Sequence, residues 1–485
     1  MAVSDGERGP RRLGTGEFVA RIGKWHTSSK ELHAALADAI RSAIECGDLR
    51  ANCILPPQRD LARTLAVSRS TIVAAFETLR REGLLQTRQG SATWVCDTRA
   101  ATGQTWLGVL GMMPVFQHPE GTGEAVINLA AAGVGIDTSL WEGRLPRVLE
   151  AAVRCEAAHG YFPAGLPDLR IALAGHLTAR GLATEPEQIL VTGGAQQAIH
   201  LVAAAWLQSG DVVLVEQPVY AGALEVFRAV GARVIGIPPD GSGPCADALS
   251  ALAERHRAKL LFLAPTCSNP TGHTLSAARR QEIVRAARKC GLLIVEDAAQ
   301  QDLAFGSVEE GYLAGQCSEH EVIVIGSLSK LFWGGLRVGW VRGEVSAMRN
   351  LSRLKSANDL GTSVIGQFLS LELLARHHEA RVRRHAQLSA LRDLAVELIT
   401  SLIPEWQPSP CSGGLALWVR LPGADAVDFA QMALRHGVTV IAGPMFDVGE
   451  DAFRDHIRVS FATEPAKLRT GIERLATAWG SYRRW

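Results

Sequence analysis

The stretch IGSLSKLFWGGLRVGW, residues 325–340, places one lysine and one arginine seven positions apart in a glycine-rich turn. An apolar run of β-branched residues, 322–325, leads into it, so Lys330 is expected at the mouth of a buried strand. Burial and the nearby charge of Arg337 both favour the neutral amine, which is the form that attacks an aldehyde to make a Schiff base. A lone lysine at a strand end is usually only a solvated charge, so this prediction depends on partners elsewhere in the chain.

The chain of 485 residues has the composition of an ordinary globular α/β protein, with 47% hydrophobic and 20% charged residues. Its length suits either one small domain joined to a large one or about three domain-sized units. The nine cysteines show no Cys-x-x-Cys pair, and neither a membrane helix nor a signal peptide is apparent. We therefore expect free thiols, a cytoplasmic location, no membrane contact and no metal site.

Residues 1–29 are rich in glycine and arginine and are predicted to form a flexible basic arm, although an ordinary disordered tail explains them equally well. Residues 30–97 show apolar positions at helical spacing in three segments, followed by two extended runs that flank Gln89 and Gly90. Three helices and a hairpin within about 65 residues describe a winged helix-turn-helix.

The second half of this segment carries the charge expected of a surface that faces phosphate. Residues 57–95 contain six arginines and three acidic residues. The third helix is expected to begin at Ser68-Arg69-Ser70-Thr71, which places hydroxyls and a guanidinium at a helix N-terminus, where phosphates bind. The alternative is that the serines only cap the helix and that Arg69 is a solvated charge.

The segment LPPQRDLARTLAVSRSTIVAAFETLRREGLLQTRQGSATWV, residues 55–95, strongly resembles the GntR family of bacterial winged-helix repressors. The likeness includes the Leu-Pro start, the Val-Ser-Arg-x-Thr helix entry and the Gly-Ser-x-Thr wing. In that family the second helix, the start of the third helix and the wing tip contact operator DNA. The resemblance implies a double-stranded promoter or operator as partner, contacted by Arg59, Ser68, Arg69, Ser70, Thr71, Arg88 and Gly90.

Residues 98–125 lack a clear periodicity and are interpreted as a linker. Short apolar strands then alternate with amphipathic helices, which predicts an α/β domain over residues 126–485. Because the strands are nearly continuous in apolar character, parallel pairing with both faces covered is the economical arrangement. The strands are expected at residues 189–191, 212–215, 233–237, 260–263, 292–295 and 322–325.

Several of these strands end in polar signals, which is where α/β sheets hold ligands. A small-residue turn at 193–196 opens a helix, so its free amides suit a phosphate. Tyr220 follows the next strand and could stack on a flat cofactor, although a half-buried tyrosine is the ordinary interpretation. Asn269, held before a proline, can present its amide to a ring hydroxyl. Asp297 needs a charged partner, either a protonated pyridine nitrogen or an arginine elsewhere.

These signals, in this order, resemble the fold-type I aminotransferases over about residues 127–485. The resemblance implies a mostly parallel sheet with helices on both faces, a small C-terminal α+β part, and pyridoxal 5′-phosphate as the cofactor. It implies that Lys330 forms the Schiff base, that Asp297 keeps the pyridine nitrogen protonated, and that Asn269 bonds the ring hydroxyl. Tyr220 would then stack on the ring, and the phosphate would be held by Gly194, Ala195, Gln196, Ser327 and Arg337.

Two further segments are similar to the same family. GYFPAGL, residues 160–166, resembles the segment whose tyrosine reaches the phosphate of the partner subunit, so Tyr161 implies a homodimer with shared sites. HIRVSF, residues 456–461, resembles the strand whose arginine binds the carboxylate of an amino acid. Arg458 is therefore expected to anchor an effector or substrate, and an exposed strand arginine is the alternative.

The order of the two domains resembles the MocR subfamily of GntR-type transcription regulators. It implies a homodimer with swapped domains, and promoter binding that responds to pyridoxal phosphate, bound as an aldimine, or to an amino compound. One alternative is an aminotransferase with an accessory N-terminal domain, and another is a regulator whose large domain is only a dimerisation scaffold. Whether substrate is turned over stays open, because Ala299 stands where relatives often carry a tyrosine and residues 332–335 replace the usual lead to Arg337.

Overall fold

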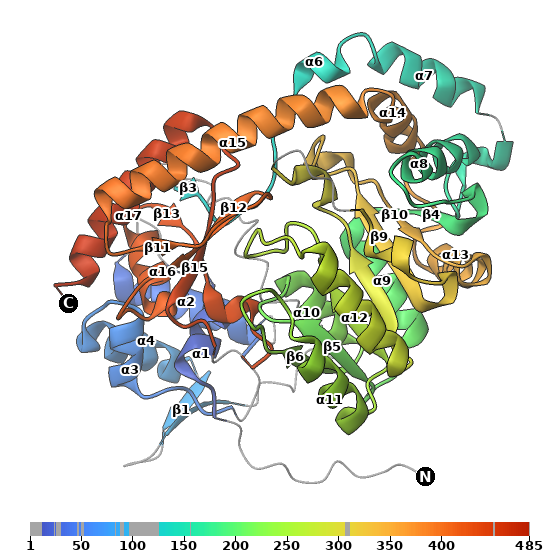
Figure 1. The fold of residues 1–485 in the computed structure, drawn as a ribbon. Helices are drawn as coiled ribbons and strands as arrows, with labels where there is room; N and C mark the ends of the chain where they lie inside the picture. Colours follow the sequence, from blue (N-terminus) through green and yellow to red (C-terminus); the bar gives the residue numbers. More distant parts are fainter. Residues whose placement is uncertain are drawn as a thin grey trace.

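The computed structural model describes residues 12–23, 25, 31–45, 48–49, 53–82, 84–87, 92–96, 126–155, 157–305, 311–449 and 452–484. Within them the chain forms an N-terminal helical unit, a large α/β unit and a small C-terminal unit (Figure 1). The predicted linker lies outside the described residues. No disulfide joins the eight cysteines that the structure describes. Among these residues, no helix combines the length and the apolar character needed to cross a membrane.

The N-terminal unit is the winged helix-turn-helix that the periodicity predicts. Ser68 caps the third of its main helices, because its Oγ accepts a hydrogen bond from the backbone N–H of Thr71 at 3.1 Å. The apolar faces of the helices share one core with the hairpin, in which Leu36, Ile72 and Phe76 are fully buried. The elements are α2 (Leu32–Glu45), α3 (Gln58–Thr64), α4 (Arg69–Arg81) and the antiparallel strands β1 (Leu85–Thr87) and β2 (Thr93–Val95).

The expectation of a flexible basic arm over residues 1–29 is wrong for part of that stretch. Thr15–Ile22 forms helix α1, and its Phe18 is fully buried in the winged-helix core beside Val19 and Ile22. These three apolar residues recur at helical spacing, a signal that the arginine- and glycine-rich composition concealed. Glu17 forms an ion pair with Arg21 at 2.6 Å, one turn away, so part of the basic charge is balanced within the helix.

The large unit is built on a seven-stranded sheet that contains all six predicted strands. These are β4 (Ile189–Thr192), β5 (Val212–Glu216), β6 (Arg233–Ile237), β7 (Leu260–Leu263), β8 (Leu293–Asp297) and β9 (Val322–Ser327). A seventh strand, β10 (Gly339–Arg342), was not predicted, because it is short and follows the glycine-rich turn directly. It runs antiparallel between β4 and β9, and the sheet order is β4-β10-β9-β8-β7-β5-β6. The remaining pairs are parallel, so the prediction of a mostly parallel sheet is confirmed.

Helices cover both faces of this sheet, as buried parallel strands require. Successive strand residues point to opposite faces: Leu190 and Val213 lie in one core cluster, while Val191 and Leu214 lie in the other. The first face is covered by α9 (Ala195–Trp206), α10 (Ala221–Ala229) and α13 (Val345–Asp359). The second is covered by α8 (Pro167–Ala179), α11 (Ala246–His256), α12 (Ala277–Lys289) and α14 (Val364–Leu374). Outside α14 lie α6 (Thr138–Trp141) and α7 (Leu145–Arg154) (Figure 1).

The small unit is the predicted C-terminal α+β part. Its antiparallel sheet has the order β11-β12-β15-β14, and a short parallel pair, β13-β3, lies beside it. The long helix α15 (His377–Leu402), orange in Figure 1, joins the two units: Ala380 lies in the core of the large unit, and Leu388 lies in that of the small unit. The other elements are β3 (Ile127–Asn128), β11 (Gln407–Pro408), β12 (Ala416–Arg420), α16 (Ala426–Arg435), β13 (Val438–Thr439), β14 (Ile441–Ala442), β15 (His456–Ser460) and α17 (Pro465–Tyr482).

The winged helix packs against the small unit of its own chain, with α3 against α16 (Figure 1). Arg435 donates a hydrogen bond to the backbone carbonyl of Ala66, and the side chains of Asp428 and Thr64 are hydrogen-bonded. Val427 adds an apolar contact to the winged-helix core. The swapped arrangement would make a contact of this kind between two chains, whereas here it is made within one.

Candidate functional site

Strand pairing brings the predicted cofactor residues to one edge of the large sheet. Because β10 is antiparallel to both of its neighbours, β4 and β9 run in the same direction and end at the same edge. Gly339 pairs with Thr192 on one side and with Ser327 on the other, so the turn after β4 meets the end of β9. Asp297, the last residue of β8, pairs with Ile325 beside them. Residues far apart in the sequence therefore converge as predicted.

The turn between β4 and α9, together with Ser327 and Arg337, forms a positively charged surface, the cationic cup. It consists of Gly194, Ala195, Gln196, Ser327 and Arg337. The first N–H groups of α9, from Ala195 onward, have no intrahelical acceptor. Gly194 has φ +109°, and a Cβ there would lie 3.0 Å from a nitrogen of Arg337, so the guanidinium packs directly on the glycine backbone. One Nη of Arg337 donates a hydrogen bond to the carbonyl of Gly193 at 2.6 Å. Ser327 stands at the same edge, so the cup suits a phosphate.

Lys330 and Asp297 are the half-buried lysine and the buried carboxylate of the site. Burial, together with the positive charges of Arg458 and Arg337, lowers the pKa of Lys330 to about 8, although Asp297 opposes this shift. Burial raises the pKa of Asp297 to about 6, despite a 2.9 Å hydrogen bond from the N–H of Ala299 and the charge of Lys330. Lys330 Nζ donates a hydrogen bond to the carbonyl of Ala132 at 2.9 Å. The site thus holds a nucleophilic amine and a carboxylate that would gain from a cationic partner.

Arg458 on β15 is only 2% exposed, which rules out the alternative of an exposed strand arginine. One Nη donates to Asn269 Oδ1 at 2.9 Å, the other donates to the carbonyl of Ala130, and the guanidinium lies 5.1 Å from the ring centroid of Phe446. Its Nε has no hydrogen-bond partner, and it forms no ion pair with an acidic side chain that the structure describes. Burial lowers the pKa of Arg458 to about 10, which marks a cation that lacks an anion.

Tyr220 caps the start of α10 and lies against the backbone of Gly222. A Cβ at Gly222 would lie 2.6 Å from the Tyr220 hydroxyl and 2.7 Å from Gln196 Oε1, so these two side chains meet over the glycine. Gln196 Nε2 donates to the Gly222 carbonyl at 2.9 Å, which leaves its buried Oε1 without a partner. Burial and the charge of Asp297 raise the pKa of Tyr220 to about 12, so its hydroxyl stays protonated.

Among the predicted cofactor-binding residues, Tyr161 alone lies away from the residues at the sheet edge. It is 59% exposed, and it lies in the segment that leads from α7 to α8. Its predicted role is to reach the site of a partner subunit, and that role stays a prediction.

Two parts of the site were not predicted from the sequence. The loop after β3 supplies the carbonyls of Ala130 and Ala132 that accept hydrogen bonds from Arg458 and Lys330. Asn128 Oδ1 shapes this loop by accepting two N–H bonds of 3.0 Å, and the small-residue run Ala-Ala-Ala-Gly was the available signal. Glu216, at the end of β5, accepts the N–H of Ala264 at 2.8 Å, and its burial raises its pKa to about 8.

Most of the described DNA-contact candidates lie at the start of α4, where Ser68, Arg69 and Ser70 are exposed and Thr71 is half-buried. Arg59 is exposed on α3. The hydroxyl of Ser68 lies 2.7 Å from that of Ser70 and 2.8 Å from that of Thr71, so capping does not bury this polar surface. Arg88 and Gly90, at the predicted wing tip, lie outside the described residues.

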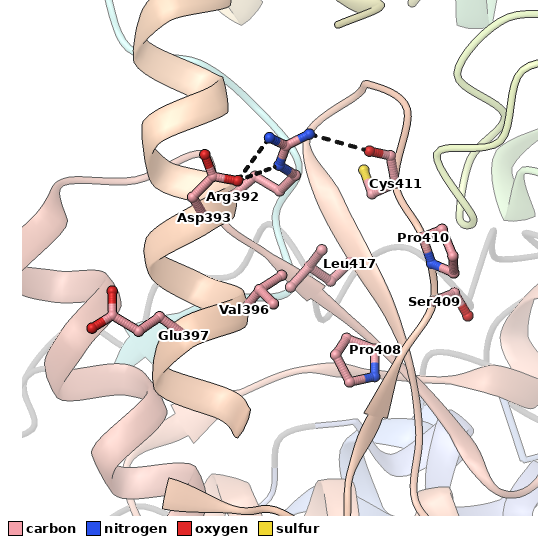
Figure 2. A pocket seen from close by; sticks show the side chains of 9 residues that line it. All are labelled: Arg392, Asp393, Val396, Glu397, Pro408, Ser409, Pro410, Cys411 and Leu417. Atoms are coloured by element: carbon pink, nitrogen blue, oxygen red, sulfur yellow. Dashed lines mark hydrogen bonds and ion pairs between the residues drawn. The ribbon is translucent and has the colours of Figure 1, made fainter. Parts of the chain in front are cut away.

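A separate hollow of about 490 Å³ lies between α15 and the β11–β12 connection of the small unit (Figure 2). There Arg392 bonds to its neighbour Asp393 and to the carbonyl of Cys411. None of the predicted site residues lines it. The lining residues are Arg392, Asp393, Val396, Glu397, Pro408, Ser409, Pro410, Cys411 and Leu417.

Comparison with known proteins agrees with this geometry. The family model "Aminotransferase class I and II" matches residues 125–475, and "Bacterial regulatory proteins, gntR family" matches residues 32–95. The α-aminoadipate aminotransferase LysN of Thermus thermophilus, solved with N-(5′-phosphopyridoxyl)-L-leucine, superposes with a TM-score of 0.69 at 28% identity. That match covers 74% of this chain and 93% of LysN.

Relatives of two kinds are found among curated proteins. The uncharacterized HTH-type transcriptional regulator YisV of Bacillus subtilis is 30% identical over 94% of this chain and 98% of its own. The 2-aminoadipate transaminase of Thermus thermophilus is 32% identical over 68% of this chain and 82% of its own. The probable rhizopine catabolism regulatory protein MocR of Rhizobium meliloti is 28% identical over 64% of this chain and 65% of its own. The chain thus belongs to the class I and II aminotransferase family, in the MocR-type group that carries a GntR winged helix.

Proposed function

We propose that this protein is a DNA-binding transcription regulator that holds pyridoxal phosphate at Lys330 and senses the cofactor or an amino compound there. One observation carries the proposal: a single chain contains both a DNA-binding surface and a cofactor site. The first is the start of α4 at residues 68–71, and the second is the Lys330–Asp297 pair at the sheet edge. The large unit also contacts the winged helix indirectly, through the small unit. We place the protein in the cytoplasm, where its DNA partner is.

The residues of the site fit pyridoxal phosphate, the cofactor of this family. The cup of Gly194, Ala195, Gln196, Ser327 and Arg337 suits the phosphate, and a protonated pyridine nitrogen would give the buried carboxylate of Asp297 its missing cation. Asn269 lies at the same edge, where its amide can bond the ring hydroxyl, and Tyr220 can cover the ring. When bound, the cofactor supplies an aldehyde that captures amines and a ring that accepts electrons.

Arg458 indicates the chemical class of the effector. It is a buried guanidinium without an acidic partner among the described side chains, and it lies within hydrogen-bonding distance of Asn269. A carboxylate would balance its charge and could take both Nη groups in a bidentate pair. The preferred effector is therefore a compound with both an amine and a carboxylate.

The small unit offers a route from the site to the DNA-binding surface. Arg458 lies on β15, which pairs with β14, and α16 precedes β14 in the same unit. Asp428 of α16 bonds to Thr64 of α3, and Arg435 of α16 bonds to the carbonyl of Ala66 just after α3. A ligand can shift DNA affinity only by binding two conformations differently, and coupling of about 1–3 kcal/mol is typical of such systems.

An aminotransferase with an accessory DNA-binding unit is the second candidate. Lys330, Asp297, Asn269 and Arg458 all lie in one cluster, and a 2-aminoadipate transaminase is among the relatives. Against rapid turnover stands Ala299, because a methyl group there offers no phenol to the ring oxygen.

We further propose a homodimer. Helix α7 exposes Leu145, Leu149 and Val153 to 55%, 62% and 73%, and their four-residue spacing makes one apolar stripe. A continuous apolar stripe on a helix usually packs against something. The exposed Tyr161 follows α7, so a partner seated there would bring this tyrosine to a second chain's site.

Lys330→Ala tests the function. Wild-type protein with added pyridoxal phosphate should show a visible absorption band that the variant lacks, because Lys330 is the lysine predicted to form the Schiff base. One amino acid of a panel should shift the band and change promoter affinity in wild type alone. Conversion of the cofactor to its amine form, reversed by 2-oxo acids, would instead favour the aminotransferase. If promoter binding is regulated in Lys330→Ala as in wild type, the large domain serves only as a dimerisation scaffold.

The rate at which the lysine-dependent band forms should depend on pH. The reactive species is the neutral amine, and the pKa of Lys330 is lowered to about 8. The rate should therefore rise steeply from pH 6 to pH 8 and then level off, whereas an ordinary lysine, with a pKa of about 10.4, would still gain above pH 9. Stopped-flow mixing at fixed ionic strength measures this, with Lys330→Ala reporting the background from other lysines. A rate that keeps rising to pH 10 would contradict the lowered pKa.

Arg69→Ala should abolish specific operator binding and leave cofactor binding intact, because Arg69 is exposed at the N-terminus of α4. A DNA titration at several salt concentrations measures the loss and separates it from general charge effects. Arg349→Ala, an exposed arginine on α13 of the large unit, is the matched control and should bind DNA as wild type does. Unchanged operator affinity in Arg69→Ala would refute the assignment.

Leu149→Asp should shift the protein from dimer to monomer, since it puts a charge in the middle of the α7 stripe. Analytical ultracentrifugation reads the mass directly. Leu402→Asp, at the far end of α15 and 44% exposed, should leave the dimer intact. A wild-type monomer, or a dimer that Leu149→Asp does not weaken, would exclude this interface.

A further inference from the structure

Three metal-binding side chains converge at a point that the proposed function does not use. His176 comes from α8, Asp302 from the turn η3 (Gln301–Leu303), and His377 is the first residue of α15. One donor atom from each lies within 4.8 Å of the other two. The sequence analysis predicted no metal, because these residues are 126 and 75 positions apart along the chain. We propose that they form a binding site for a divalent transition-metal ion of the zinc class.

One pair of donors lies slightly closer together than two ligands on one ion. Nε2 of His377 lies 3.0 Å from Oδ1 of Asp302. Zinc binds imidazole nitrogen and carboxylate oxygen at about 2.0–2.2 Å, so two tetrahedral ligands stand roughly 3.4 Å apart. Despite the short distance, this buried nitrogen has no aligned hydrogen-bond partner. Oδ1 already accepts a hydrogen bond from Arg180, so it is the nitrogen that a shared ion would give a partner.

The third ligand lies close to the second. The rings of His176 and His377 have centroids 4.3 Å apart and planes inclined at 60°. To complete a three-ligand set, the two donor atoms that lie farthest apart must approach each other by about 1.5 Å, to the distance between two ligands of one zinc ion. Rotation of an imidazole ring can supply this movement.

Arg180 is the competing partner of Asp302. Its guanidinium donates a hydrogen bond to the same carboxylate, and with Arg381 it adds positive charge near the histidines. Arg180 bonds to Oδ1, the same oxygen that lies near His377, so an ion bound at Oδ1 would displace the arginine to Oδ2. The carboxylate would then bind the metal with one oxygen and keep the arginine with the other, as in sites whose ligating carboxylates are themselves hydrogen-bonded. His385 also lies 3.0 Å from the Asp302 carbonyl and fixes this turn. The positive surroundings should weaken the site without removing its ligands.

An ion here would tie the start of α15 to the large unit. Helix α15 passes into the core of the small unit, and Asp302 lies five residues after Asp297. The metal would thus restrain the helix that connects the two units, at a place separate from the Lys330 site.

The test is zinc binding to untagged, cofactor-loaded protein. Equilibrium dialysis should give one equivalent of zinc per chain in wild type, and at least ~tenfold weaker binding in His176→Ala and His377→Ala, since each variant loses one of three ligands. His378→Ala removes the exposed histidine next in sequence and should bind as wild type does. Zinc should also raise the thermal unfolding midpoint of wild type and of His378→Ala only.

Two outcomes would overturn the proposal. Absence of zinc binding in wild type would mean that the cluster is only an ion-pair network with Arg180. Equal binding by wild type and both alanine variants would mean an adventitious ion only. Should the variants fail to fold, anomalous scattering at the zinc edge from a soaked wild-type crystal decides: a peak among the three side chains supports the site, and none refutes it.

Discussion

The arrangement of this protein depends on charges held out of water at one edge of a parallel sheet. The half-buried Lys330 and the buried Arg458 bring positive charge to this edge, and Asp297 is the buried carboxylate that faces Lys330. Arg337 adds positive charge at its exposed rim. Removing charged groups from water is costly unless an opposite charge compensates. The lowered pKa of Lys330 and the raised pKa of Asp297 show that compensation within the chain is incomplete. A ligand with a phosphate, a basic ring nitrogen and an aldehyde supplies the missing partners together, which is why one small molecule can organise so many residues.

The same edge is shared by two structural units, which under the proposed function would let a ligand at the site affect DNA binding. Lys330 and Asp297 belong to the large unit, whereas Arg458 comes from the small unit and reaches across to Asn269. A molecule that binds at both ends therefore spans the boundary between the units. Because the winged helix packs on α16 of the small unit, a change at that boundary alters the support of the DNA-binding surface.

Most of the fold and much of the site could be predicted from the sequence. Apolar strands followed by polar residues are local signals, so β7, β8 and β9 were predicted directly, and Asn269, Asp297 and Lys330 at their ends were predicted as site residues. Strand β10 and the loop at Ala130–Ala132 were missed, because their roles depend on pairing and on backbone carbonyls rather than on side-chain type. The cluster of His176, Asp302 and His377 was invisible for a related reason: only the folded chain brings three distant segments together.

Helix α1 has a practical consequence for dividing this protein into parts. The GntR family model begins at residue 32, yet the hydrophobic core of the winged helix extends back to Phe18 and Leu13. A fragment cut at the family boundary would present the apolar surface of α2 and α3 to solvent and would tend to self-associate. The folded module is therefore longer than the segment that the family model matches. The same holds for gene fusions and reporter chimeras, whose junctions belong upstream of residue 12.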